Sequence, residues 1–309
     1  MSLKLPRLPS IRDLTRIYNL RANQRLSQNF IMDKNVTDKM VSLAGLELKN
    51  SLVVEVGPGP GLLTRSILDR GALNVVAVEK DPRFEPTLHQ LRDVAQNRFH
   101  PIIDDMLQID HQEIVSSGLG LGPPNGEERL TAFDNVHLVG NLPFSVATPL
   151  LIQWLHMLAK KEGIFGLPNV TMTLMFQREV ADRITAMEGE SPRGRLSVVA
   201  QSLCDAFRIY RVPASSFVPR PRVDAAVVQL RPLPEPPLKS SLRTVEHLAR
   251  FVFMKRRKML ARTFKDWDPT KLQLLEECGI DPTLRAQDVP AEKFCELARI
   301  IEQRDIKLP

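Results

Sequence analysis

The sequence has 309 residues, of which 43% are hydrophobic and 25% are charged, and its formal net charge is +6. This composition predicts a soluble globular protein with one large and one small domain. It excludes a membrane-spanning protein, because no apolar run approaches the ~20 residues that a membrane helix needs. The modest positive charge favours a polyanionic partner without identifying one.

The sequence contains no motif that indicates a metal site or a disulfide. The three cysteines, Cys204, Cys278 and Cys295, show no CxxC spacing, and the six histidines form no HExxH motif and no cluster with cysteine. We therefore expect reduced, semi-buried thiols and no metal site.

The first 25 residues contain six basic side chains and a single acid, Asp13. We expect a short basic helix over 10–22. A basic, acid-poor amphipathic start is typical of an organelle targeting segment. A basic helix of the mature protein that contacts RNA or solvent explains the same composition equally well. The apolar stripe of this helix would consist of Leu14, Ile17, Tyr18 and Leu20.

The next elements predict a nucleotide-binding loop. A polar and aromatic stretch at 26–33 opens a second helix, with Asp33 as its N-cap. The apolar run at 51–56 predicts a buried strand, and an amphipathic segment at 61–70 predicts the helix after it. Alternate glycines join the two, because a backbone without Cβ can turn sharply and lie against a ligand.

The spacing of these glycines, Gly57, Gly59 and Gly61, narrows the choice of ligand. A dinucleotide fingerprint requires a third glycine five residues after the first, where this chain has Leu62. The acid Glu55 two residues before the loop and the compressed spacing fit S-adenosylmethionine better. The loop alone remains weak evidence, because similar turns serve NAD, FAD and tight packing.

Further acids follow the next two predicted strands, 74–79 and 99–103. Glu79 ends the first strand and could accept hydrogen bonds from both ribose hydroxyls. Asp105 follows the second, where its carboxylate could accept from the adenine amino group while the Met106 N–H meets a ring nitrogen. Singly, each acid would be interpreted as an exposed loop residue. Together they indicate the ligand crevice at the carboxyl ends of parallel strands.

The remaining chain predicts alternating strands and helices and then a helical end. We expect an α/β fold, a Rossmann-like S-adenosylmethionine-dependent methyltransferase fold with a mostly parallel sheet and an antiparallel edge. Residues 110–133 are rich in glycine and proline and predict a surface insertion. Further helices are expected at 84–95, 147–161, 177–186, 195–204, 245–264 and 291–303, and further strands at 136–139, 170–176, 206–212 and 223–231. Prolines near 232 mark a linker, so the predicted domains are 1–25, 26–231 and 232–309.

A more specific motif, Asn141-Leu142-Pro143-Phe144, follows the predicted strand at 136–139. The exocyclic nitrogen of adenine is a poor nucleophile, because its lone pair is delocalised into the ring. The Asn141 side-chain oxygen and the Leu142 carbonyl could each accept one N–H of that amine and aim its lone pair at a methyl group. Pro143 would stiffen the turn, and Phe144 would offer a face for a flipped-out base. The alternative is a purely structural turn.

The chain resembles the ribosomal RNA adenine N6,N6-dimethyltransferase family nearly from end to end. The matching blocks, in the family's order, are LSQNFIMD at 26–33, VEVGPGPG at 54–61, VEKD at 78–81, GNLPFSVATPLL at 140–151, FQREVADR at 176–183, GRLSVVAQ at 194–201 and FVPRPRVDAAVV at 217–228. This resemblance implies dimethylation of two adjacent adenines near the 3′ end of small-subunit rRNA. It assigns S-adenosylmethionine contacts to Gln28, Asn29, Phe30, Ile31, Glu55, Gly57, Gly59, Glu79, Lys80, Asp105, Met106 and Asn141.

The details of the match favour the mitochondrial branch of that family. Bacterial members usually have NLPY-N in the catalytic motif, whereas this chain has Phe144 and Ser145. The resemblance therefore implies a monomer in the mitochondrial matrix whose partners are the small-subunit rRNA and the assembling subunit, with the mitochondrial transcription machinery as a further partner. The resemblance also implies that the basic N-terminus is a targeting segment, part of which stays in the mature protein.

Two basic groups are candidates for RNA contact. Arg220 and Arg222 flank a proline in a predicted loop, and four consecutive cations, Lys255, Arg256, Arg257 and Lys258, fall inside a predicted helix. A solvated helix surface is the usual fate of such a run, but an rRNA substrate favours phosphate contacts. Such contacts give affinity without base identity.

Two other functions stay open at this point. A DNA adenine methyltransferase shares the asparagine–proline–aromatic logic but lacks the downstream blocks at 194–201 and 217–228. A non-catalytic transcription or ribosome-assembly factor could retain the fold. The presence of Gly57, Glu79, Asp105 and Asn141 favours an active enzyme.

Overall fold

The computed structural model of the chain describes residues 4–23, 28–119 and 133–309. The chain divides into two compact units. The first comprises 1–181 and 208–229, and the second comprises 182–207 and 230–309. The predicted boundary at 232 instead places 182–207 in the methyltransferase domain. The structure groups these residues with the C-terminal helices because α8 (Arg195–Gln201) packs on α9 (Leu242–Met254) and α12 (Ala291–Gln303).

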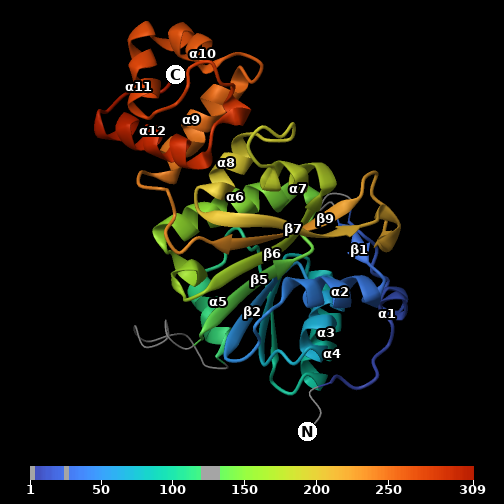
Figure 1. Cartoon of the computed structure of the whole chain (residues 1–309). Helices are drawn as coiled ribbons and strands as arrows, with labels where there is room; N and C mark the ends of the chain where they lie inside the picture. The colour runs from blue at the N-terminus through green and yellow to red at the C-terminus, as the bar shows by residue number, and fades with distance from the viewer. Residues whose placement is uncertain (1–3, 24–27, 120–132) are drawn as a thin grey trace. The chain divides into compact units, whose positions relative to one another are not determined.

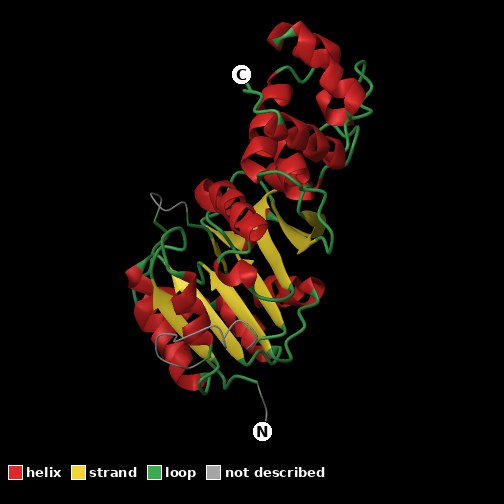
Figure 2. Cartoon of the chain, turned by 90° about the vertical axis from the view of Figure 1, so that its left-hand side faces the viewer, coloured by secondary structure: helices red, strands yellow, loops and turns green. Residues whose placement is uncertain are grey.

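A seven-stranded sheet has the strand order β4-β3-β2-β5-β6-β9-β7 (Figures 1 and 2). The five strands from β4 to β6 are mutually parallel. Their apolar runs suit a sheet that is covered on both faces, and Leu52, Val53 and Val54 have no exposed surface. The strands are β2 (Ser51–Val56), β3 (Asn74–Glu79), β4 (Phe99–Ile103), β5 (Asn135–Gly140), β6 (Val170–Gln177), β7 (Cys204–Val212) and β9 (Ala225–Pro232).

β9 runs antiparallel to both of its neighbours. The Arg178 N–H, just after β6, bonds the Asp224 carbonyl, just before β9, at 2.9 Å. The Leu233 N–H, just after β9, bonds the Leu203 carbonyl, just before β7, at 2.8 Å. On both sides of β9, the end of one strand therefore lies beside the start of its neighbour, which confirms the predicted antiparallel edge.

Helices cover both faces of the sheet in the first unit (Figure 1). On one face, α2, α3 and α4 contribute buried apolar side chains such as Met40, Ile67 and Leu88 to a common core with the strands. On the other, α5 and α6 follow β4 and β5. The bounds are α1 (Ile11–Ile17), α2 (Lys34–Ala44), α3 (Leu62–Asp69), α4 (Glu85–Val94), α5 (His111–Gly118), α6 (Phe144–Lys160) and α7 (Arg178–Thr185), with 3-10 turns η2 (Pro82–Phe84), η4 (Gly163–Gly166) and η5 (Ala214–Ser216).

The N-terminal basic stretch belongs to the first unit's core over part of its length. Leu14 of α1 is 1% exposed, whereas Ile17 is 67% exposed, so only part of the predicted apolar stripe is buried. The Arg65 guanidinium donates to the Pro9 carbonyl at 2.7 Å, and the Leu5 N–H donates to the Asp69 carboxylate at 3.1 Å. This packing fixes the segment against α3.

The predicted N-cap Asp33 is confirmed, since its side chain accepts from the Asn35 N–H and α2 starts at Lys34. The stretch before it contains strand β1 (Phe30–Ile31), which was not predicted and pairs antiparallel with β8 (Phe217–Val218). The predicted insertion at 110–133 begins with helix α5, whose Ile114 is fully buried. Its apolar residues therefore complete the core. The remainder of the predicted insertion, 120–132, lies outside the described residues.

The second unit has its own apolar core, in which Val198, Phe264 and Cys295 are fully buried. Its helices are α8, α9 (Leu242–Met254), α10 (Leu260–Trp267), α11 (Gln273–Glu277) and α12 (Ala291–Gln303), with 3-10 turns η6 (Pro269–Leu272) and η7 (Ala286–Asp288). Across the described parts of both units, no helix is long and apolar enough to cross a membrane.

Candidate active site

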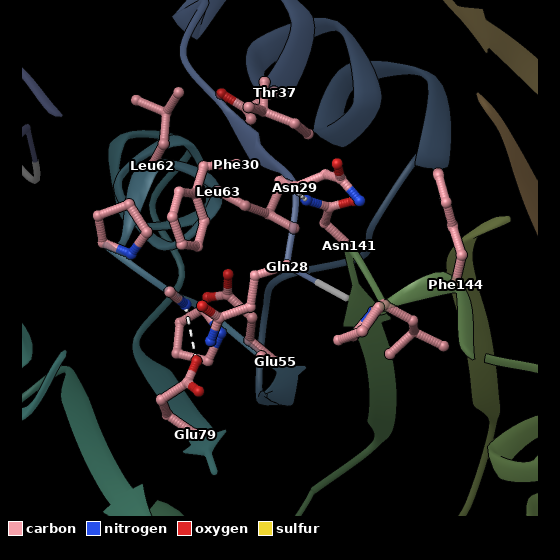
Figure 3. Close-up of a pocket in the computed structure, with 17 residues that line it drawn as sticks. Gln28, Asn29, Phe30, Thr37, Glu55, Leu62, Leu63, Glu79, Asn141 and Phe144 are labelled. Atoms are coloured by element: carbon pink, nitrogen blue, oxygen red, sulfur yellow. Dashed lines mark hydrogen bonds between the residues drawn. The ribbon is translucent and has the colours of Figure 1, made fainter. Parts of the chain in front are cut away.

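A pocket opens in the first unit at the carboxyl ends of β2, β3 and β5 (Figure 3). Its walls come from three segments far apart in sequence: residues 28–31, the glycine loop, and the motif at 141–144. This is the edge at which open parallel sheets bind ligands. The predicted residues that line it are Gln28, Asn29, Phe30, Ile31, Glu55, Gly57, Gly59, Glu79, Asn141, Leu142, Pro143 and Phe144.

The glycine loop has a backbone that other residues rarely adopt. Gly57, Gly59 and Gly61 have φ angles of 67°, 53° and 85°, in the left-handed region. A side chain at Gly59 would also come within 3.4 Å of the Phe30 ring. The Gly57 N–H donates to the carbonyl of Val78 at 2.9 Å, which ties the loop to β3. The sequence thus specifies this turn through glycine alone.

The loop leads directly into α3, whose N-cap is a glycine without a capping side chain. Leu62 and Leu63, in the first turn of this helix, line the pocket. The first N–H groups of a helix have no partners within the helix and carry a partial positive charge. This end of the pocket therefore suits an anionic ligand group such as a carboxylate.

Two buried carboxylates lie beneath the loop. Glu79, at the end of β3, accepts from the Gly59 N–H at 2.9 Å through one oxygen and from the Asp81 N–H at 2.8 Å through the other (Figure 3). Burial raises the pKa of Glu79 to about 7, although these two hydrogen bonds oppose the rise. Each oxygen retains a lone pair for a ligand hydroxyl.

Glu55, within β2, is 1% exposed. Burial raises the pKa of its carboxyl to about 8, and the nearby Glu79 adds to the rise. Its Oε2 atom has no hydrogen-bond partner among the described residues. An unpaired buried polar atom is costly, so this oxygen suits a donor supplied by a ligand, such as an ammonium group.

Residues 28–31 are held in place over the glycine loop. The Gln28 amide donates to Asp81 at 2.9 Å, and the pairing of β1 with β8 anchors Phe30 and Ile31. Hydrogen bonding from Arg83 lowers the pKa of Asp81, which keeps that carboxylate charged. The Phe30 ring also packs edge-to-face on Phe84 at 5.4 Å.

Asn141 follows the last residue of β5 and faces the same segment. Its Nδ2 donates to the Asn29 carbonyl at 3.0 Å, and Figure 3 shows the two asparagines side by side. This bond fixes the orientation of the amide, because the carbonyl can only accept. The Asn141 Oδ1 then remains available to accept from another group. Gly140, just before it, permits the close approach of β5 to β2, since a Cβ there would lie 2.9 Å from the Val56 carbonyl oxygen.

The rest of the motif forms the start of α6. Leu142 is 1% exposed, and Pro143 is the N-cap of the helix. Phe144 is the first helical residue and lines the pocket with a half-buried ring. The helix that was predicted to begin at 147 therefore begins three residues earlier, and the Phe144 side chain is attached to a rigid helix.

Three predicted cofactor residues do not line this pocket: Lys80, Asp105 and Met106. Lys80 and Asp105 instead pair with each other at 2.6 Å, beyond the ends of β3 and β4. Although burial opposes it, this ion pair lowers the pKa of Asp105. Thr37, Pro58, Pro60, Leu62 and Leu63 line the pocket but were not predicted as site residues. No sequence pattern marked Thr37 as a site residue, because it lies among the buried residues of α2.

The structure places the predicted RNA-contact arginines of the first unit on an exposed loop. Arg220 and Arg222 follow β8, and neither guanidinium has a hydrogen-bond or ion-pair partner among the described residues. The loop is supported by Asp224, which accepts from the Ala214 N–H at 2.9 Å and pairs with Arg211 at 2.7 Å. The two arginines therefore lie exposed on a loop that these bonds hold in place.

The predicted helical position of Lys255, Arg256, Arg257 and Lys258 was wrong. α9 ends at Met254, and these residues form the turn before α10, where the Lys258 N–H bonds the Lys255 carbonyl at 2.8 Å. Lys255 pairs with Asp266 at 2.8 Å, and Arg256 hydrogen-bonds Gln287. Arg257 and Lys258 are exposed and have no such partner in the described part of the chain.

A metal centre has no support in the described part of the chain, where no group of three or more His, Cys, Asp or Glu side chains could hold an ion. The three cysteines are buried and free. Burial raises the pKa of Cys278 to about 11 and of Cys295 to about 12, so these thiols are unreactive.

Comparison with known proteins gives this site a family. A family model described as ribosomal RNA adenine dimethylase matches residues 19–303. The chain belongs to the ribosomal RNA adenine dimethylase family. Dimethyladenosine transferase 1, mitochondrial, from Vermamoeba vermiformis is 38% identical over 99% of this chain and 98% of its own length. The human protein of that name is 40% identical over 99% of this chain and 89% of its own.

Solved structures share the fold of this ribosomal RNA adenine dimethylase. A dimethyladenosine transferase from Plasmodium falciparum has a TM-score of 0.67 and 22% identity, covering 89% of this chain and 98% of that one. The 23S rRNA methyltransferase ErmE has a TM-score of 0.60 and 24% identity over 89% of this chain and 100% of its own. The predicted family, its mitochondrial branch, the fold class and the enzyme class are confirmed.

Proposed function

We propose that this enzyme methylates N6 of two adjacent adenosines in the 3′-terminal hairpin loop of mitochondrial small-subunit rRNA, giving N6,N6-dimethyladenosine at both. The observation that supports it best is the hydrogen bond from Asn141 to the Asn29 carbonyl beside the glycine loop. It directs one amide oxygen at the pocket, which is the acceptor that an aromatic amine requires.

The residues of the pocket fit S-adenosylmethionine, whose sulfonium supplies an electrophilic methyl group. Glu79 would accept from the ribose hydroxyls, and the unpaired oxygen of Glu55 would accept from the ammonium group. The first turn of α3 would hold the carboxylate. Asp105 and the Met106 N–H would reach the adenine once Lys80 releases its ion pair. Asn29, Phe30 and Ile31 would cover the ligand.

The protein's own part in the reaction is to position the amine. The Asn141 Oδ1 and the Leu142 carbonyl accept the two N–H bonds, which directs the nitrogen lone pair toward the incoming methyl group. Phe144 stacks on the flipped-out base. The nitrogen would gain the methyl group as the bond of that group to the cofactor sulfur breaks, and the methylated amine would then lose one proton to water. Two rounds on each adenosine would complete the product, so the pocket must also accept a monomethylated amine, which fits a motif that offers carbonyl acceptors and no dedicated base.

RNA affinity would come from exposed cations in both units, Arg220 and Arg222 in the first and Arg257 and Lys258 in the second. Phosphate contacts of this kind weaken as salt rises. We place the enzyme in the mitochondrial matrix, acting during maturation of the small ribosomal subunit, because the similar curated proteins are named mitochondrial. A non-catalytic role in transcription or assembly is the second candidate, and the intact pocket disfavours it.

The test is methyl transfer to a synthetic RNA hairpin with two adjacent loop adenosines. The purified full chain and radiolabelled S-adenosylmethionine should give N6,N6-dimethyladenosine on nucleoside analysis. A matched hairpin with guanosines at the two positions is the control and should remain unlabelled. If S-adenosylmethionine binds but the adenosines gain no methyl group, both on the hairpin and on isolated small subunits, the enzyme assignment fails.

A further inference from the structure

The second unit contains a hollow between α9 and α10 with a volume of about 450 Å³. This falls in the roughly 300–1,000 Å³ range of small-ligand sites. Every residue that lines it lies in the second unit, whereas the methyl-transfer pocket lies in the first. The reaction described above makes no use of it.

Aromatic rings form the floor of this hollow. Phe251, Phe264 and Trp267 pack edge-to-face on one another, with centroids 5.5 to 6.1 Å apart. Phe264 is fully buried and supports the other two rings, which are half-buried and line the hollow. The Trp267 indole N–H has no hydrogen-bond partner among the described residues. A rigid apolar surface with a free donor at its edge is thus open to a ligand.

The rim of the hollow is cationic. Arg250 is exposed, and no hydrogen bond or ion pair engages its guanidinium within the described chain. Lys255 pairs at 2.8 Å with Asp266, the one acidic side chain that lines the hollow, whose lining also includes His247 and Pro309. Asp266 also pairs with Arg262 at 3.1 Å, so two cations share one carboxylate. A positive charge therefore remains beside the aromatic floor.

The cationic rim continues into a neighbouring groove that Lys255 also lines. This groove has a volume of about 660 Å³, and its walls include Arg257, Lys258 and Arg262. Met254, which is 77% exposed, lines both hollows. Planar apolar surfaces beside a track of cations are what single-stranded nucleic acid requires, because bases stack while phosphates follow the charge.

We propose that the hollow between α9 and α10 binds one unpaired nucleotide of the RNA substrate. The base packs on Trp267 and Phe251, and Arg250 and Lys255 hold its phosphates. The adjoining groove takes the next stretch of backbone. The inference rests on the proposed function for the RNA substrate, and adds a second place, in the other unit from the methyl-transfer pocket, at which an unpaired base is held.

Tryptophan emission tests this directly, because the chain has two tryptophans and Trp154 is fully buried. A short single-stranded RNA should quench the emission of the wild-type full chain. The Trp267→Phe variant should lose that quenching, since stacking on the indole causes it. Inorganic polyphosphate supplies phosphates without bases and should leave the emission unchanged. RNA binding without quenching, or equal quenching by polyphosphate, would overturn the proposal.

Hairpin binding gives an independent readout. Trp267→Leu should weaken hairpin affinity about tenfold, the effect of one lost stacked base, whereas Trp267→Phe keeps a ring and most of the affinity. Arg250→Ala should also weaken binding, while Lys307→Ala, a matched loss of one exposed charge in the same unit, should not. Equal affinities for Trp267→Leu and wild type would contradict the proposal.

The methylation assay separates this inference from the proposed function. The Trp267→Leu change should raise the KM for the hairpin, with the loss carried by KM and not by kcat, because the hollow lies outside the methyl-transfer pocket. If wild type methylates the hairpin and Trp267→Leu has the same KM, only this inference fails. If wild type binds and quenches without methylating, only the proposed function fails.

Discussion

The buried Glu55 carboxyl makes the stability of the free protein depend on pH. It is buried within β2, and one of its oxygens has no partner among the described residues. Burial raises its pKa to about 8 in the folded state, against 4.5 for an ordinary glutamate. The folded protein therefore binds this proton more tightly than the unfolded chain. The stability that this bound proton contributes is fully present below about pH 4.5 and is lost as the pH rises through about 8.

The Glu55→Gln variant should remove the contribution of Glu55 to this pH dependence, while that of Glu79 remains. At pH 9 its free energy of unfolding should exceed that of the wild type by a few kcal/mol, on the order of 1.4 kcal/mol per unit of pKa shift removed. Below pH 4.5 the two should be equal, since both side chains are then neutral. Thermal melts without ligand at pH 4, 7 and 9 measure this. Glu113→Gln on the exposed face of α5 is the control, and equal pH slopes for wild type and Glu55→Gln would refute the argument.

At the scale of elements, the β1–β8 pair links the pocket to the exposed arginine loop within the first unit. β8 pairs with Phe30 and Ile31, and the next residue, Met32, donates its N–H to the Ser216 carbonyl at 3.3 Å. The same short segment provides the Asn29 carbonyl that orients Asn141. The asparagine thus depends on a strand that the chain contributes nearly two hundred residues after Asn29.

The Met32→Pro variant should show this dependence. Proline removes the N–H that bonds Ser216, and its ring still suits the extended backbone before α2. We expect kcat for methyl transfer to fall about tenfold, because misplacement of a reacting group by a fraction of an ångström is costly. Met32→Leu keeps the N–H and is the control. An unchanged kcat in Met32→Pro, with the protein folded by circular dichroism, would show that the pairing does not position Asn141.

Patterns within one segment of the sequence predicted most of the elements. The bounds of β2, β3 and the last helix, α12, match the predicted ranges 51–56, 74–79 and 291–303, because apolar period and end signals determine them. The errors have a different origin. β1 is two residues long and exists only through its pairing with β8, which no local pattern contains. The basic run at 255–258 lies after the end of α9, and Lys255 and Arg256 contact Asp266 and Gln287, which are distant in sequence.

The same division applies to the site. The glycine loop and the acid at the end of β3 could be predicted, because φ requirements and strand ends are local. The Asn29–Asn141 bond and the lining by Thr37 could not, because they join segments that meet only in the fold. The Lys80–Asp105 ion pair was likewise invisible to a pattern that assigned both residues to a ligand.

At the scale of the whole molecule, one buried cation assembles the second unit from two stretches of chain. Arg193 has no exposed surface. Its guanidinium donates to the Ala186 carbonyl at 3.1 Å, to Gln201 at 2.8 Å and to the Val289 carbonyl at 2.9 Å. The bond to Val289 joins 182–207 to the C-terminal stretch and, with the packing of α8 on α9 and α12, accounts for the departure of the structural division from the predicted boundary at 232.

Replacing Arg193 should therefore unfold the second unit selectively. Arg193→Met loses charge-assisted bonds and leaves buried carbonyls unpaired, which should cost on the order of 2–4 kcal/mol. Hydrogen exchange should show lost protection in α8 and α12 while β2 and β5 stay protected. Arg195→Met, which breaks a half-exposed pair with Glu246, should cost under about 1 kcal/mol. Uniform loss of protection in both units would contradict this picture.

Methyl transfer by the Asn141→Ala variant, measured with S-adenosylmethionine binding in the same preparations, tests whether Asn141 holds the target amine. If Asn141 holds the target amine, kcat on the hairpin should fall at least about 100-fold, while the cofactor Kd rises less than about tenfold. Ser145→Ala, on the exposed side of α6, should retain wild-type values. Near-wild-type kcat in Asn141→Ala would contradict the account.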